Sequence, residues 1–405
     1  MIVRSITLLG HKDHGKSTLI GNLLMLTNSV TQTRIEEAET YSKKLHKNFE
    51  PAFILDSFFA ERTGGLTIDI TRAEISYKGK AFSFIDVPGH EELIKNMISG
   101  ASYANTALLL VSAKSDEGIR DQTKRHLFIA KMMGIDRLVV AVNKMDAVGY
   151  KERRFKEMVD GLSEFIGKIG FNLKNVEFVP VSAYVGDNLV ERSRRTPWYR
   201  GKPLLEQLYE ESGDAHANVS GPLRLLVQGV INAGEPLIAG RIIKGKVSVG
   251  DNVCIVPDKR AIRVKGITVK GRSAKQAKSG ENVALSVSAP VTGDMRGSLI
   301  CGEAYCPVPR DTLEARIFLT KRLGKGLSIR FNGIDVPIKS IKIKERIDPT
   351  TGEPDRSKAV KPLDAYEAEL KLSRRIPAES FDETRELGRF VLYSGKEFSG
   401  IGVIK

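Results

Sequence analysis

The first half of the chain alternates short apolar runs with segments in which apolar residues recur at helical spacing. The apolar runs predict strands at residues 2–9, 81–85, 107–112, 138–142 and 176–181. Helical spacing is clearest for Phe155, Met158, Val159, Leu162, Phe165 and Ile166. Such alternation predicts an α/β domain with a mostly parallel sheet covered by helices on both faces. The short turn between residues 70–77 and 81–85 predicts one antiparallel hairpin in that sheet.

The second half has a different pattern, with short β-rich runs separated by turns. Ile262 and Val264 alternate with Arg263 and Lys265, as expected for a half-buried strand. Many short strands with few helical patterns predict two all-β barrels, with a break near Pro307. A polar segment with glycines after residue 212 is a plausible linker between the α/β domain and the first barrel. The predicted domains are residues 1–212, 213–306 and 307–405.

Charge differs between the two halves of the 405-residue chain, whose formal net charge is +14. Residues 1–215 carry 30 basic and 28 acidic side chains, whereas residues 216–405 carry 33 and 21. A basic field attracts polyanions such as RNA, although a well-solvated surface is the simpler alternative. The difference suggests chemistry in the first half and polyanion contact in the second.

Composition narrows the class of protein. Hydrophobic residues make up 41% and charged residues 28%, as in ordinary globular proteins. We expect no membrane span, because no apolar run approaches the roughly 18 residues that a span needs. We expect no export signal either, because the first residues already form a predicted strand. The three cysteines, Cys254, Cys301 and Cys306, are too few for a disulfide scaffold and lack the companions of a zinc site. A reducing cytoplasm is the expected compartment.

Residues 10–17 fit the pattern G-x-x-x-x-G-K-[ST] between a predicted strand and the helical run 17–26. In such a loop, glycines let backbone N–H groups surround phosphates, and the helix N-terminus adds partial positive charge. Lys16 would reach the β- and γ-phosphates, and the Ser17 hydroxyl would bind Mg²⁺. A tight turn is the alternative, but the strand and helix around the motif favour a phosphate loop.

Three further motifs end predicted strands in the expected order. Asp86 begins Asp-Val-Pro-Gly-His, so its carboxylate would hold the metal through water and the Gly89 N–H would lie near the γ-phosphate. Asp146 ends Asn-Lys-Met-Asp, and its carboxylate would accept the N1 and N2 hydrogens of guanine, which adenine cannot supply. Asn143 and Lys144 would brace the base and the phosphate loop, and Ser182-Ala183 would offer a backbone N–H to guanine O6. Together the motifs predict a GTP-binding domain.

These motifs make the whole chain resemble the elongation factor Tu and elongation factor 1-alpha family of translational GTPases, on its archaeal and eukaryotic side. Residues 53–70 and 86–104 resemble the first and second switches of the family. Residues 222–251 are similar to its second-domain barrel, and residues 386–405 resemble the end of its third domain. The resemblance implies the order GTPase domain, barrel, barrel.

The resemblance also implies residue roles. Thr67 would bind Mg²⁺ and the attacking water, and His90 would orient that water, so that catalysis is mostly positioning by His90, Thr67 and Lys16. Asp13 matches a position linked to a monovalent cation, or it caps the loop. Mg²⁺ would be held by Ser17, Thr67 and Asp86. The residues predicted to bind GTP or GDP are Gly10, His11, Asp13, His14, Gly15, Lys16, Ser17, Thr18, Gly89, Asn143, Lys144, Asp146, Ser182 and Ala183.

The sequence departs from the family at three places. Lys12 stands where the family has a valine of an apolar gate, while Leu66 supplies the other half; its ammonium either pairs with a phosphate or extends to water. Thr63 and Gly64 replace charged residues of the first switch, which lowers helix propensity there. The third domain is short, and no histidine follows His216.

Three functions compete on these grounds. The first is a GTP/GDP switch that carries tRNA or a tRNA-like partner to the ribosome, in elongation, termination or rescue, with a nucleotide exchange factor. The second is the regulatory GTPase subunit of ATP sulfurylase, and the third is a nucleotide-binding module without useful hydrolysis. The basic barrels favour the first, through Arg263, Lys265, Lys270, Arg272, Lys275 and Lys278.

Overall fold

A computed structural model gives the structure, which describes residues 3–55, 71–86, 106–115, 117, 119–210, 220–233, 235–291, 295–355 and 359–405. The chain divides into two compact units. One contains residues 1–215 with 348–353, and the other contains residues 216–347 with 354–405. The boundaries expected after residues 212 and 306 stay predictions.

The first unit is built on a six-stranded sheet in the order β2-β3-β1-β4-β5-β6. The strands β1, β3, β4, β5 and β6 run parallel, and β2 pairs antiparallel with β3. The predicted mixed sheet with one hairpin is therefore confirmed. The strands are β1 (Val3–Leu9), β2 (Thr71–Tyr77), β3 (Lys80–Asp86), β4 (Thr106–Ser112), β5 (Arg137–Asn143) and β6 (Val176–Pro180).

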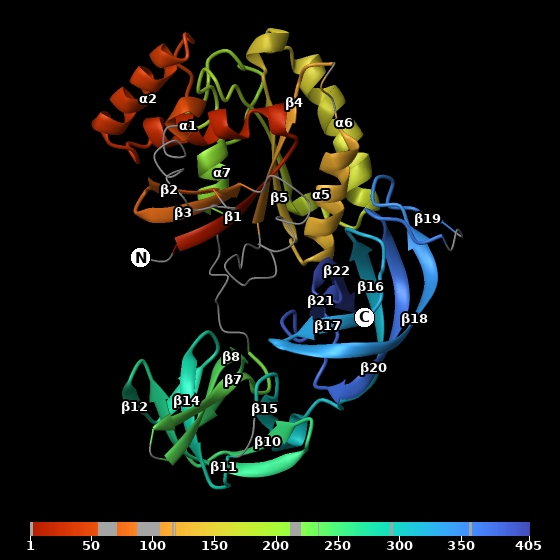
Figure 1. Ribbon diagram of the computed structural model, residues 1–405. Helices are drawn as coiled ribbons and strands as arrows, with labels where there is room; N and C mark the ends of the chain where they lie inside the picture. Colours follow the sequence, from red (N-terminus) through yellow and green to blue (C-terminus); the bar gives the residue numbers. More distant parts are fainter. Residues whose placement is uncertain are drawn as a thin grey trace. The chain divides into compact units, whose positions relative to one another are not determined.

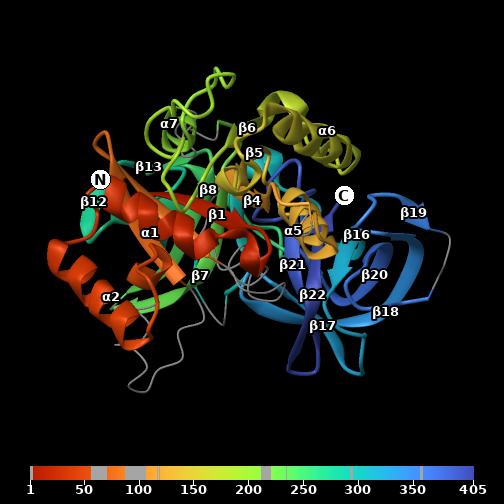
Figure 2. The same cartoon turned by 90° about the horizontal axis from the view of Figure 1, so that it is seen from above.

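Helices cover both faces of this sheet, as Figures 1 and 2 show. Helices α1 and α7 pack on one face, where Leu19, Leu23 and Leu205 join strand residues in one buried core. Helices α5 and α6 lie over the other face. The helices are α1 (Lys16–Leu26), α2 (Gln32–Lys44), α5 (Asp121–Met132), α6 (Glu152–Lys168) and α7 (Leu204–Glu210).

Most boundaries of the predicted strands and helices differ from the observed boundaries by one residue. The strand expected at 138–142 extends to Asn143, and the helix expected at 17–26 begins at Lys16. Hydrophobic patterning marks the buried part of an element, whereas its ends depend on hydrogen bonding. Among the residues of α6 expected to face the core, Met158, Leu162, Phe165 and Ile166 are buried.

The second unit contains two antiparallel barrels (Figure 1). In the first barrel the order β10-β15-β7-β8-β14-β11 closes through pairing of β11 with β10. Its strands are β7 (Arg224–Ala233), β8 (Glu235–Lys244), β10 (Asn252–Val256), β11 (Arg260–Val269), β14 (Asn282–Val287) and β15 (Leu299–Gly302), with short β9 (Lys246–Ser248), β12 (Arg272–Ala274) and β13 (Gln276–Lys278).

In the second barrel the order β17-β21-β22-β16-β20-β18 closes through pairing of β18 with β17. The six strands of each ring therefore close on themselves, which confirms the predicted fold class. Its strands are β16 (Arg310–Leu319), β17 (Leu327–Phe331), β18 (Ile334–Ile347), β20 (Ala365–Ile376), β21 (Arg389–Ser394) and β22 (Glu397–Ile404), and β19 (Pro354–Asp355) pairs with β18.

The alternation expected in β11 is confirmed, since Ile262 and Val264 are buried while Arg263 and Lys265 are exposed. Within the residues described, no helix is long and apolar enough to cross a membrane.

Candidate nucleotide-binding site

Those predicted site residues that the structure describes lie at the carboxyl ends of parallel strands of the first sheet. The phosphate loop, residues 10–17, leaves β1 and enters α1, and Asn143 is the last residue of β5. The base loop, residues 182–188, follows β6. In an open parallel sheet this edge is where ligands bind, because strand ends and helix starts converge there.

Two glycines of the phosphate loop have conformations and surroundings that exclude a side chain. Gly10 has φ 133°, and a Cβ there would lie 2.4 Å from the Leu110 carbonyl oxygen. Gly15 has φ 90°, and its Cβ would lie 2.6 Å from Asn143 Nδ2. L-amino acids rarely adopt such φ values, so both positions require glycine. The resulting cradle, at the start of α1, fits a phosphate group.

Lys16 spans this loop. Its Nζ donates to the carbonyl oxygens of Gly10 at 3.0 Å and His11 at 3.2 Å, and the side chain is buried. The ammonium group is thus held at the loop, where its positive charge would stabilise the negative charge of a bound phosphate. Ser17 and Thr18 follow in the first turn of α1, both half-buried.

The two histidines of the phosphate loop make different contacts. His14 is fully buried, with Nδ1 3.0 Å from the Leu110 carbonyl oxygen, so that Nδ1 carries the proton. Burial lowers the pKa of His14 and keeps the ring neutral. Its side chain therefore anchors the loop to β4, and its backbone N–H donates to the His11 carbonyl oxygen at 3.1 Å. His11 is half-buried and hydrogen-bonds Gln122 of α5 at 2.8 Å.

Asn143 joins the phosphate loop to the base loop. Its Nδ2 donates to the His14 carbonyl oxygen at 2.8 Å, and its Oδ1 accepts the Ala183 N–H at 2.8 Å. Asn22 of α1 adds a second link, since its Nδ2 donates to the carbonyl oxygens of Ala183 at 2.9 Å and Tyr184 at 3.2 Å. The Ala183 N–H is thus engaged with Asn143, and its contact with guanine O6 stays a prediction.

The residues after Asn143 are arranged for a ligand. Lys144 has φ 62°, a backbone conformation that is costly for a lysine and that clusters at functional sites. Its Nζ donates to both oxygens of Glu117, at 2.8 and 2.6 Å. Burial alone would raise the pKa of Glu117, but hydrogen bonds from Lys144 and Ser112 lower it. Asp146 is exposed at the start of a short 3-10 turn, so its carboxylate is accessible.

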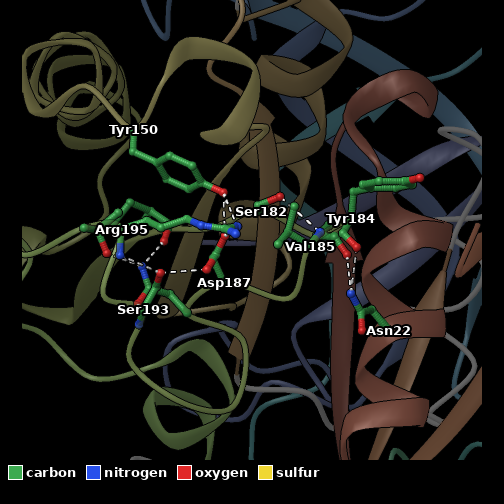
Figure 3. A network of polar contacts seen from close by, with 12 residues as sticks. Asn22, Tyr150, Ser182, Tyr184, Val185, Asp187, Ser193 and Arg195 are labelled. Carbon is green, nitrogen blue, oxygen red and sulfur yellow. Dashed lines mark hydrogen bonds and ion pairs between the residues drawn. The ribbon is translucent and has the colours of Figure 1, made fainter.

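A polar network supports the base loop (Figure 3). The Asp187 carboxylate accepts from Ser193 Oγ at 2.6 Å, from Arg195 at 3.1 Å and from the Tyr150 hydroxyl. Burial alone would raise the pKa of Asp187, but these three donors hold it below its usual value. The Ser182 N–H donates to the Asp187 carbonyl oxygen at 3.2 Å, which closes the loop on itself. The network therefore fixes the loop that follows Ala183.

Several predicted residues cannot be placed. Thr67, Gly89 and His90 lie outside the described residues, as do Thr63, Gly64 and Leu66. Asp86 is the last residue of β3, but its side chain and that of Lys12 lie outside the description too. Asp13 is exposed, 3.9 Å from His11 Nε2.

Four residues that support the site were not identified from the sequence: Asn22, Glu117, Tyr150 and Asp187. Asn22 had a detectable signal, as a lone amide within the apolar run of α1. The others lie on loops, where a single polar residue has no informative pattern.

A Gly-rich phosphate loop, a lysine across it and an Asn-Lys-Met-Asp motif beside a braced base loop define a P-loop guanine-nucleotide-binding protein. Residues 1–214 match the family model described as "Elongation factor Tu GTP binding domain", and residues 314–405 match "GTP-eEF1A C-terminal domain-like". The chain belongs to the elongation factor Tu and elongation factor 1-alpha family of translational GTPases. It is a GTPase that binds GTP and GDP.

Curated relatives agree over nearly the full length. Elongation factor 1-alpha of Aeropyrum pernix is 35% identical, covering 99% of this chain and 95% of that protein. Elongation factor 1-alpha of Saccharolobus solfataricus is 35% identical over 99% and 96%. A crystal structure of sup35 complexed with GDP is 25% identical, covers 99% of this chain and 93% of that chain, and has a TM-score of 0.43.

Replacing Asn143 tests the link between the two loops. We expect Asn143→Ala to weaken GDP binding about 10- to 100-fold, because two buried hydrogen bonds are lost and their partners stay buried. Titration with a fluorescent GDP analogue measures the affinity. Asn172→Ala, which removes an exposed amide that caps a short turn, is the control and should bind normally. Equal affinity of both variants would contradict the bridging role.

The contribution of Asp187 to the free energy of unfolding should depend on pH. Its pKa is lowered in the folded state, so the stabilisation is complete above the unfolded pKa, near pH 4, and is lost as pH falls through the folded value. Asp187→Asn should therefore lower the thermal unfolding midpoint at pH 7, and the difference from the unaltered chain should shrink toward about pH 3. Asp160→Asn, at an exposed position of α6, should show little difference at any pH. A gap that stays constant down to that pH would refute this assignment.

Proposed function

We propose that this GTPase carries tRNA, or a protein shaped like tRNA, to the ribosome, and that it is released after GTP hydrolysis. The observation that carries the proposal is the exposed basic surface of the first barrel. Six basic side chains on and between β11, β12 and β13 are all exposed: Arg263, Lys265, Lys270, Arg272, Lys275 and Lys278. A phosphate backbone is the natural partner of such a surface.

The relatives support this assignment by their names, since both are elongation factor 1-alpha and match the chain from end to end. The compact third domain, without a histidine after His216, is why the cargo is stated as tRNA or a tRNA-like protein. A cytoplasmic location and an exchange factor that replaces GDP with GTP belong to the same proposal.

In the proposed nucleotide site, the N–H groups of residues 10–18 and the Lys16 ammonium hold the phosphates. Asp146 accepts from guanine, and Lys144 and the base loop flank the base. Mg²⁺ would be held by Ser17, Thr67 and Asp86, where it would neutralise phosphate charge. Asp13 is the proposed contact of a monovalent cation.

Hydrolysis is proposed to depend on positioning. His90 would orient the attacking water, Thr67 would bind Mg²⁺ and that water, and Lys16 would stabilise charge on the phosphoryl oxygens. Loss of the γ-phosphate would release the first switch and so change the affinity for the carried partner.

Ribosomes should accelerate GTP hydrolysis by this chain. We expect strong stimulation by archaeal or eukaryotic ribosomes, and a loss of about 100-fold or more in His90→Ala, because removing one preorganised group at the reacting atoms typically costs about 10²- to 10³-fold in rate. Phosphate release under single-turnover conditions measures the rate. His46→Ala removes an exposed histidine of the same unit and should behave as the unaltered chain. GTP binding without any ribosome response would favour the sulfate-activation or non-hydrolysing alternatives.

The basic surface should govern tRNA affinity. We expect the GTP-bound chain to bind tRNA more weakly as salt rises, and the combined change of Lys265, Lys270 and Arg272 to alanine to reduce the slope of log affinity against log salt by about 2 to 3. Filter binding across a salt series measures the slope.

A control with the same change in net charge separates this surface from the general basicity of the chain. Alanine at Arg322, Lys325 and Lys396, which are exposed on the second barrel, should leave the slope nearly unchanged. Equal slopes for the two triple variants would locate binding elsewhere.

A further inference from the structure

All three cysteines of the chain converge at one place in the second unit. Their Sγ atoms lie within 4.8 Å of one another, and all three thiols are free. Cys254 is on β10 and Cys301 on β15, where they are paired across neighbouring antiparallel strands. Cys306 follows the short turn of residues 303–305 and folds back over them. The spacing along the sequence gave no sign of this cluster.

The cluster lies on the outer side of the first barrel. Val253, Ile255 and Ile300 belong to that barrel's own core, whereas Cys254 and Cys301 belong to a separate buried cluster shared with strands of the second barrel. Cys254 and Cys301 are 7% and 0% exposed, and Cys306 is half-buried, so solvent reaches the group from the side of Cys306.

The three thiols have only weak partners. Cys301 Sγ lies 3.5 Å from the Cys254 carbonyl oxygen, Cys306 Sγ 3.7 Å from that of Gly302, and Cys254 Sγ 3.9 Å from that of Ile255. Thiols are poor donors, so replacing these contacts costs little. The sulfur lone pairs are therefore available to a better partner.

We propose that Cys254, Cys301 and Cys306 form a binding site for one thiophilic d¹⁰ cation, Zn²⁺ or Cu⁺, held by three thiolates. Soft sulfur ligands select such ions. With metal–sulfur bonds of about 2.3 Å, three sulfurs around one ion lie roughly 3.8 to 4.0 Å apart, so the observed cluster needs shifts of less than about 1 Å.

Protonation of the thiols makes binding of the ion depend on pH. Burial raises the pKa of Cys254 to about 11 and of Cys306 to about 11, so the free thiols are protonated at neutral pH. Binding of the ion must displace these protons, and affinity should rise with pH. Near Cys301, the positive charge of Arg224 and the negative charge of Glu379 act on its pKa in opposite directions, and burial raises that pKa.

A bound ion would stiffen the start of the connection between the barrels. It would tie β10 and β15 of the first barrel to Cys306, which precedes Pro307 and β16 of the second. The ion would thus stabilise the second unit without touching the nucleotide site, so this inference does not rest on the proposed function.

The test uses the full chain, reduced and kept under argon, titrated in separate arms with Zn²⁺, with Cd²⁺ as its spectroscopic substitute, and with Cu⁺ as its acetonitrile complex. We expect one ion per chain, an ultraviolet sulfur-to-metal charge-transfer band with Cd²⁺ or Cu⁺, and release of protons. Cys306→Ser should lose the band and bind at least about 100-fold more weakly. The arm with the tighter binding identifies the ion.

Ala304→Ser, in the same exposed turn, is the matched control and should keep one ion and the band. Normal GDP binding and circular dichroism show that each variant is folded. The proposal is wrong if the unaltered chain gives no sulfur band with either ion, or if Cys306→Ser binds as tightly as the unaltered chain. It is also wrong if the reduced chain binds no ion while air oxidation consumes two thiols, which would assign a redox pair instead.

Discussion

The nucleotide site depends on one buried amide, that of Asn143. Its two ends hydrogen-bond the backbone of the phosphate loop and of the base loop, which leave different strands of the sheet. Because both contacts are made inside the protein, neither loop can move without breaking a hydrogen bond that water does not replace. Asn22 and Asp187 restrain the base loop from its other sides. The distance between phosphate and base positions is thus set by the sheet and not by the loops themselves.

The barrels depend on packing across a shared buried surface. Arg224 of the first barrel and Glu379, after β20, form an ion pair 9% and 7% exposed, and Thr384 also donates to Glu379. A buried charge is tolerated only when it is paired and hydrogen-bonded, so this contact requires a definite arrangement of the residues around it. The six basic side chains on and between β11, β12 and β13 are, by contrast, exposed.

Much of the fold and of the site could be predicted from particular residues. The phosphate loop and the Asn-Lys-Met-Asp motif lie at strand ends, as the apolar runs before them predicted, and parallel strands bring their carboxyl ends to one edge. The half-buried pattern of β11 was also confirmed, because successive side chains of a strand point to opposite faces of the sheet. The side chain of His14 was not predicted to point into the protein, since its position in a phosphate loop carries no information on its rotamer. Ends of strands were off by a residue because hydrogen bonding, not hydrophobicity, decides them.

The sequence by itself determined what local rules govern: the α/β unit and the barrels from periodicity, and the phosphate loop from its glycines and lysine. The contact of Asp146 with guanine stays a prediction. Only the tertiary structure decided which distant residues meet. Sheet order places Asn143 beside both His14 and Ala183, and antiparallel pairing of β10 with β15 brings Cys254 to Cys301. Such contacts arise from strand neighbours, and strand order is chosen by packing of the whole core, which no short stretch of sequence encodes.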